Sequence, residues 1–205
     1  MEYHDFQPTG FIRDKLPDDI FLELKELCNM SSIPVNHRLA GNIEKEYHLP
    51  VLTEKVGEKL LKHIFLMANE YEKRYPSPVI KVLDKDLPMG FGEVWVNYQK
   101  KYEFNPVHLH TGVWSFVIWV QIPYNLEDEL KNLSSLNSNS NIPSVFQFLY
   151  ENIYGSATEE LYINKSHEGT IILFPANLKH CVYPFYTSDD YRISIAGNIC
   201  FKVQV

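Results

Sequence analysis

The sequence predicts a mainly β (α+β) fold in which helices come first and a sandwich or barrel of short strands follows. Two observations lead to this prediction. In the first third of the chain, apolar residues recur at helical spacing, whereas from Gly90 onward they alternate with a period of two. This later part holds at least seven short runs rich in β-branched and aromatic residues, mostly separated by polar, Pro- or Gly-containing segments.

Two helices are expected in the part before about residue 88. The segment 16–30 has Pro17 and two acids near its start, which favours a helix N-terminus, and apolar residues three and four apart follow. The segment 51–75 carries one apolar stripe opposite a face of Lys and Glu, which is the pattern of an amphipathic helix.

Strands are expected to fill the core, about residues 89–205. The candidates are 92–99, 115–123, 144–151, 159–164, 169–175, 181–185 and 191–205. Residues 125–144 become rich in Asn and Ser, which predicts a surface insertion with one short helix. A length of 205 residues with 45% apolar content predicts a single domain over 1–205.

Charge and cysteine content narrow the class of protein. A net charge of −7 disfavours a nucleic-acid partner, because phosphate binding needs clustered Lys and Arg. Three cysteines without a CxxC pair indicate a reducing compartment. The chain shows no signal-like segment and no apolar run that would span a membrane, so we expect a soluble, cytoplasmic protein.

Three histidines are candidate metal ligands. His108 and His110 are two residues apart, so on an extended chain their imidazoles point to one side and can approach one ion. An exposed polar strand face would give the same pattern. His180 opens a strand candidate, and a barrel would bring it back against an earlier strand. An imidazole between apolar strands needs a metal or a partner, and a core histidine bonded to backbone is the alternative.

A basic residue is expected in the same cavity. Arg192 and Ser194 alternate with isoleucines, so the two polar side chains share a face that points into the cavity if the isoleucines pack outside it. A buried Arg requires an anion, and its planar fork suits a carboxylate. The alternative is a surface Arg paired with Asp189 or Asp190.

Taken in order, these residues resemble the motifs of the Fe(II)/2-oxoglutarate-dependent dioxygenases over about residues 93–199. HCVYP, from His180, is similar to the His-x-Val-x-Pro of prolyl-hydroxylase-like members, and RIS, from Arg192, to their Arg-x-Ser. The segment 94–123 looks most like short phage-type and bacterial members. The resemblance implies a double-stranded β-helix (jelly roll) with the N-terminal helices packed outside.

The resemblance also implies an activity and site roles. The enzyme would use Fe(II), 2-oxoglutarate and O2 to hydroxylate an unidentified prime substrate, either a peptide or protein residue or a small molecule. The implied iron ligands are His108, His110 and His180. The implied 2-oxoglutarate contacts are Arg192, Ser194 and Tyr98, the last because it lies ten residues before His108, where prolyl hydroxylases have a tyrosine.

Position 110 departs from the family pattern, which has a carboxylate there. His110 can be a ligand in a three-histidine site, or it can stand aside while a water or a distant carboxylate such as Glu103 completes the shell. The third alternative is that the site holds iron poorly or not at all. We rank them in this order, because imidazole also suits Fe(II).

Four more side chains are candidates to line the pocket: Trp114, Trp119, Gln121 and Asn97. Trp119 and Gln121 share one strand face, although Trp119 equally fits the barrel core. Trp114 is expected in a loop beside the histidine pair, where it could cover the substrate. Asn97 points away from Tyr98, so both line one pocket only across a bulge, and the spacing favours Tyr98.

Two other classes of protein fit parts of the sequence. Residues 169–180, GTIILFPANLKH, also fit the second cupin motif, which implies a metal-dependent protein that does not use 2-oxoglutarate. Arg192 would then have no assigned role. The missing carboxylate at position 110 also fits a non-catalytic jelly-roll protein whose metal site has decayed.

Overall fold

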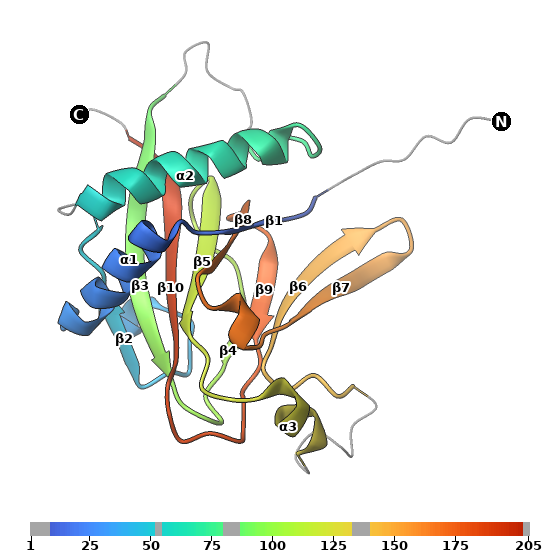
Figure 1. Cartoon of the computed structure of the whole chain (residues 1–205). Helices are drawn as coiled ribbons and strands as arrows, with labels where there is room; N and C mark the ends of the chain where they lie inside the picture. Colours follow the sequence, from blue (N-terminus) through green and yellow to red (C-terminus); the bar gives the residue numbers. More distant parts are fainter. Residues whose placement is uncertain (1–8, 52–54, 80–86, 133–139, 203–205) are drawn as a thin grey trace.

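The strands form two antiparallel sheets that face each other (Figure 1), in a computed structural model that describes residues 9–51, 55–79, 87–132 and 140–202. The large sheet runs β1 (Ile12–Lys15), β8 (Thr170–Pro175), β5 (Trp114–Gln121), β10 (Arg192–Phe201), β3 (Met89–Gln99) and β2 (Lys45–His48). The small sheet runs β4 (Asn105–His108), β9 (Lys179–Val182), β6 (Val145–Asn152) and β7 (Gly155–Tyr162).

Two helices cover the outer face of the large sheet, α1 (Asp18–Met30) and α2 (Lys55–Glu72) (Figure 1). Both confirm the helices predicted from apolar spacing. Leu24 of α1 and Leu60 of α2 have no exposed surface and pack in one cluster with Phe116 and Ile195 of the sheet. This first core explains why helices are needed, since the sheet is apolar on its outer face as well as its inner one.

A second core lies between the two sheets. Trp95 and Trp119 from the large sheet pack in one cluster with Phe146 and Phe148 of β6. The strands in the middle of the large sheet are therefore buried on both faces, which is why β5 and β8 read as nearly continuous apolar runs. The arrangement is the predicted double-stranded β-helix with its N-terminal helices outside.

The remaining segments complete the ends of the sheets. The part expected to be helical also contributes β1 and β2, which the sequence did not reveal, and the 3-10 turn η1 (Asn36–Arg38). A second 3-10 turn, η3 (Lys165–His167), precedes β8. The short helix predicted in the insertion is α3 (Leu126–Lys131), while residues 133–139 lie outside the described residues.

The insertion is fastened to the body of the protein through one buried carboxylate. Glu129 has no exposed surface and accepts hydrogen bonds from the backbone N–H groups of Tyr186 and Thr187 at 2.8 and 2.7 Å. Among the described residues, no helix has the length and apolar character needed to cross a membrane.

Replacing Leu60 by Ala should lower the free energy of unfolding by about 2–5 kcal/mol, because it leaves a cavity between α2 and the large sheet. Leu66→Ala is the matched control on the same helix. Leu66 is 65% exposed, so its truncation should cost less than about 0.5 kcal/mol. Urea denaturation of both variants measures the difference, and equal losses would contradict the packing described.

Candidate metal centre

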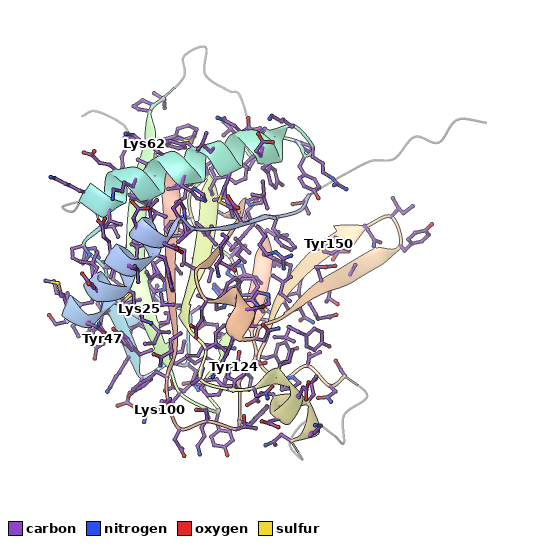
Figure 2. All side chains as sticks on the ribbon, in the orientation of Figure 1. Lys25, Tyr47, Lys62, Lys100, Tyr124 and Tyr150 are labelled. Atoms are coloured by element: carbon purple, nitrogen blue, oxygen red, sulfur yellow. The ribbon has the colours of Figure 1, made fainter. Side chains whose placement is uncertain are left out.

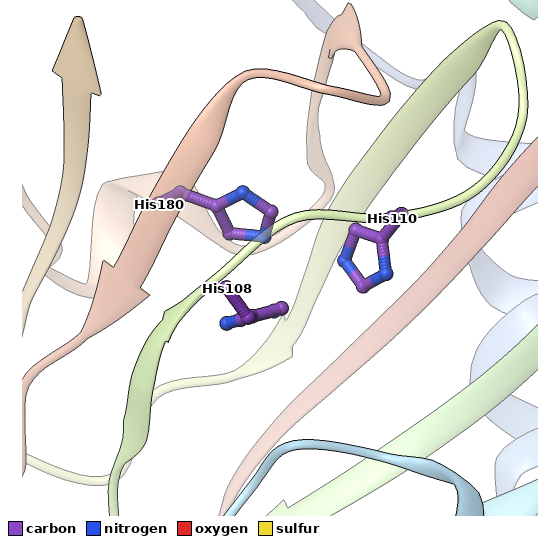
Figure 3. Close-up of side chains that lie close together, drawn as sticks. All are labelled: His108, His110 and His180. Atoms are coloured by element: carbon purple, nitrogen blue, oxygen red, sulfur yellow. The ribbon is translucent and has the colours of Figure 1, made fainter.

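Three imidazoles converge at the open edge of the small sheet. β4 pairs with β9 so that His108 lies directly opposite His180. His110 follows β4 on the loop to β5, and its backbone N–H donates to the carbonyl of Ala176 at 2.8 Å. Figure 3 shows the three rings around one common space. One ring nitrogen of each histidine lies within 4.8 Å of those of the others.

Hydrogen bonds to the backbone orient two of the rings. His108 donates from Nδ1 to the carbonyl of Pro106 at 2.7 Å, and His180 from Nδ1 to that of Leu178 at 2.9 Å. A ring nitrogen that faces a carbonyl carries the proton, so the Nε2 lone pair of each ring stays available. Metal-binding histidines are held in the same way, with the second nitrogen bonded to a carbonyl or carboxylate.

Burial keeps the imidazoles neutral. His180 is 2% exposed and lies between aromatic rings, with Phe146 stacked on it at 5.4 Å and Phe174 edge-on at 5.0 Å. Desolvation, with a smaller effect from His108, lowers the pKa of His180 to about 3 and that of His110 to about 4. Neutral imidazole is the form that binds a metal ion, so the donor set fits a divalent transition metal.

A cavity of about 40 Å³ connects the histidines to the other polar residues that the sequence singles out. Of the predicted site residues, those that line it are His108, His110, His180, Asn97, Trp119, Arg192 and Ser194. The volume holds about three water molecules, so a larger ligand requires side chains to move. The histidines and Arg192, far apart in sequence, thus line the same cavity.

Arg192 is buried, at 2% exposure, and within the described part of the chain its guanidinium donates only to neutral oxygens. Nε and Nη2 both donate to Oε1 of Gln99, at 3.1 and 2.7 Å. Nη1 donates to the Tyr124 hydroxyl (labelled in Figure 2) and the Ser144 carbonyl, and Nη2 also to the carbonyl of Tyr183. The alternative of a surface Arg paired with a neighbouring aspartate is therefore wrong.

Tyr98 does not lie in this cavity, and the expectation that it contacts a cosubstrate there is wrong. Its hydroxyl donates to the carbonyl of Cys28 in α1 at 2.7 Å, on the helix-covered face of the sheet. β3 keeps a regular register with β10 up to Gly197, so no bulge turns Tyr98 inward. Asn97 takes the inward position and donates to the Ser194 hydroxyl at 3.3 Å.

The two other aromatic candidates take different places. Trp114 is the first residue of β5 instead of a loop residue, and it packs edge-on against Tyr71 of α2, so it cannot cover the histidines. Trp119 lines the cavity and also packs against Phe146. Gln121 is outside the cavity lining and donates to the carbonyl of Tyr191 at 3.0 Å.

Glu103 is not part of the histidine cluster. Its carboxylate accepts from the backbone N–H groups of Glu44 and Lys100 at 2.9 and 2.7 Å. Among the described residues, the group that could hold a metal ion here consists of the three histidines. Sequence reasoning also missed Gln99, the double acceptor of Arg192. Its position two residues after Asn97 on the same strand was the available signal.

The fold and this cluster define a class, jelly-roll proteins that carry a histidine-rich cavity between their sheets. Within that class, residues 93–198 match the model of the family described as "Putative 2OG-Fe(II) oxygenase", which spans more than half of the chain. The chain belongs to this family of 2OG-Fe(II) oxygenases, whose cofactors are Fe(II) and 2-oxoglutarate.

Solved structures share the fold at low sequence identity. A prolyl-4-hydroxylase from Pseudomonas putida matches with a TM-score of 0.58 and 13% identity, covering 95% of this chain and 94% of that one. HygX from Streptomyces hygroscopicus, with nickel, 2-oxoglutarate and hygromycin B bound, matches with a TM-score of 0.55 and 10% identity, covering 95% of this chain and 84% of that one. A Trichoplax adhaerens prolyl hydroxylase in complex with a hypoxia inducible factor peptide matches with a TM-score of 0.52 and 14% identity, covering 94% of this chain and 83% of that one. No curated protein matches the sequence.

The stability of the metal-free protein should fall as the pH drops below about 6.5. The folded-state pKa values of His180 and His110 lie below the ordinary value, so the unfolded chain binds more protons in this range and is favoured there. His180→Leu should make the loss between pH 7 and pH 5 smaller by about 2 kcal/mol.

Urea titrations at the two pH values measure this difference. His37→Leu is the control, because His37 is exposed and lies outside the cavity. An unchanged pH dependence in His180→Leu would show that the imidazole is not buried neutral.

Proposed function

We propose that the protein is an Fe(II)- and 2-oxoglutarate-dependent dioxygenase in which His108, His110 and His180 hold the iron. The observation that carries the proposal is the meeting of three neutral imidazoles on one side of a cavity that also contains a buried guanidinium. Bound iron, with 2-oxoglutarate and O2, supplies the oxidation, which yields succinate and CO2 and hydroxylates the substrate.

The role of the histidines is to present three nitrogen ligands on one face. The carbonyls of Pro106 and Leu178 hold the rings of His108 and His180 in the tautomer with a free Nε2. The aromatic wall around His180 limits the approach of water from the core side, so exchangeable ligands enter from the cavity.

Arg192 is proposed to bind the far carboxylate of 2-oxoglutarate, with Ser194 beside it. A buried cation with only neutral partners is a place where an anion is stabilised. Gln99 Oε1 accepts from Nε and Nη2 together, which is the edge that a carboxylate occupies in a bidentate pair. Binding of 2-oxoglutarate therefore requires the Gln99 side chain to release Nε and Nη2 of Arg192. Such a movement agrees with the small volume of the cavity.

The substrate is proposed to approach beside Asn97 and Trp119, the remaining predicted residues that line the cavity. Structures with a similar fold contain either a peptide or a small molecule, hygromycin B, so both substrate types remain within the proposal. The cytoplasmic location remains a prediction from the sequence.

Replacing His110 tests whether it is a ligand. His110→Leu should weaken Co(II) binding on the order of 100-fold, because one of three protein ligands is lost, while His110→Asp should retain binding, because it provides a carboxylate. Calorimetric titration measures both. His63→Leu is the control, since His63 lies near Asp14 at 3.2 Å, outside the cavity. Unchanged affinity in His110→Leu would favour the arrangement in which His110 stands aside.

The cosubstrate is tested with Mn(II) and 2-oxoglutarate under anaerobic conditions. The wild type should bind 2-oxoglutarate, and Arg192→Met should weaken that binding about 10- to 100-fold, as expected for the loss of a charge-assisted bidentate contact. Arg38→Met is the control, because Arg38 is exposed and pairs with Glu93.

With Fe(II) and O2, the wild type should also form succinate, slowly alone and faster with host-cell extract. Binding of 2-oxoglutarate that does not depend on Arg192, or the absence of iron-dependent succinate in both assays, would contradict the proposed function and favour a cupin-type or non-catalytic protein.

A further inference from the structure

Three buried oxygen atoms beside the cavity lack hydrogen-bond partners in the part of the chain that the structure describes. They are Oε2 of Glu46, Oδ1 of Asn97 and Oδ1 of Asn105, here called the acceptor cluster. Glu46 is 1% and Asn97 5% exposed. Buried polar atoms are hydrogen-bonded in the great majority of cases, so orphan acceptors at one place indicate a missing donor.

The three side chains lie together at the β2 edge of the cavity. Glu46 and Asn97 are direct partners in the β2–β3 pair, so they point to the same face, and Asn97 and Asn105 both line the cavity. A Cβ atom on Gly41 would lie closer than 3 Å to both Asn105 Oδ1 and Glu46 Oε1, so these oxygens flank the same point. Tyr47, the next residue of β2, packs on the opposite, helix-covered face (Figure 2).

The surroundings of the cluster are negative. Burial and the nearby carboxylate of Glu103 raise the pKa of Glu46 to about 7. Within the described ranges no Lys or Arg forms an ion pair with Glu46: Lys45 lies over the Tyr191 ring, and the Arg192 donors are engaged elsewhere. Above pH 7, where Glu46 is ionised, the cluster therefore offers acceptors and negative charge, and no Lys or Arg of the described residues pairs with them.

We propose that the acceptor cluster binds a primary ammonium group of the prime substrate; this inference rests on the proposed function. An ammonium nitrogen carries three donors and no acceptor, which matches three acceptors without donors. Its positive charge compensates the buried carboxylate of Glu46, which water or an amide would not do. The net charge of −7 also favours the approach of a cationic substrate.

The experiment compares amines with neutral compounds of the same shape. Nα-acetyl-lysine amide and 1,5-diaminopentane are titrated by calorimetry into the wild type at pH 8, with and without Mn(II) and 2-oxoglutarate. The neutral isosteres are the Nα-acetyl amide of 2-aminoheptanoic acid, for the lysine compound, and 1,5-pentanediol, for the diamine. At least one of the two amines should bind ten times more tightly than its isostere. Tighter binding of the lysine compound would indicate a peptide substrate, and tighter binding of the diamine would indicate a free polyamine. Equal binding of amines and isosteres would overturn the proposal.

A matched pair of variants locates the site. Glu46→Gln keeps the size of the side chain and should reduce amine binding at least tenfold, whereas Glu44→Gln removes a carboxylate from an exposed position two residues away and should change nothing. Mn(II) should broaden the NMR signals of the CH2 protons next to the amine nitrogen in the wild type, and this broadening should be lost in Glu46→Gln. Amine binding that is equally strong in Glu46→Gln would place it elsewhere and refute the proposal.

The two proposals fail separately. If Mn(II) and 2-oxoglutarate bind but amines show no preference over isosteres, the ammonium site is wrong and the oxygenase proposal stands. If neither metal nor 2-oxoglutarate binds, the oxygenase proposal fails, and the calorimetric comparison on the metal-free protein still decides whether the acceptor cluster prefers an amine.

Discussion

The pairing of β4 with β9 is the contact on which the rest of the site depends. It places His108 directly opposite His180, and partners in an antiparallel pair point to the same face. A shift by one residue would turn one imidazole to the other face and separate the donors. β6 pairs with β9 on its other side, where Phe148 is the partner of His180, so the aromatic core between the sheets also fixes the position of His180 in the histidine cluster.

The cavity holds three groups of polar side chains that differ in charge, and each group lacks a different kind of partner. The three imidazoles are neutral because they are desolvated, so they offer lone pairs without charge. Arg192 carries a positive charge, and its hydrogen-bond acceptors among the described residues are all neutral oxygens. The acceptor cluster offers oxygens, one of them from the Glu46 carboxyl group, that have no donor among the described residues. A cation, an anion and a donor are therefore each favoured at a different wall of one cavity.

The sequence predicts those features that depend on local periodicity or motif spacing. The helices α1 and α2 follow from apolar spacings of three to four residues, and the shared inward face of Arg192 and Ser194 follows from a spacing of two. The ten-residue spacing to His108 favoured Tyr98 over Asn97, and this was wrong, because the pleat of β3 turns Tyr98 to the helix-covered face. The prediction that Trp114 lies in a loop is wrong because β5 begins one residue earlier than the expected strand. Strand boundaries are predicted from sequence less accurately than the presence of a strand. The role of Glu46 arises from pairing with a strand far along the chain, which no local pattern reveals.

In the proposed iron site, the histidine at position 110 takes the place of a carboxylate and so changes the charge of the ligand set. There, three neutral imidazoles would leave a divalent ion with its full charge, and Arg192 would contribute one further positive charge. A dianion such as 2-oxoglutarate would therefore be held more strongly than beside a carboxylate ligand. The same excess positive charge lowers the pKa of a nearby carboxyl. Glu46 would therefore be more fully ionised in the loaded protein than in the empty one. Loading of the metal and cosubstrate would thus strengthen the binding of a cationic substrate, and by reciprocity such a substrate would bind most tightly to the loaded protein.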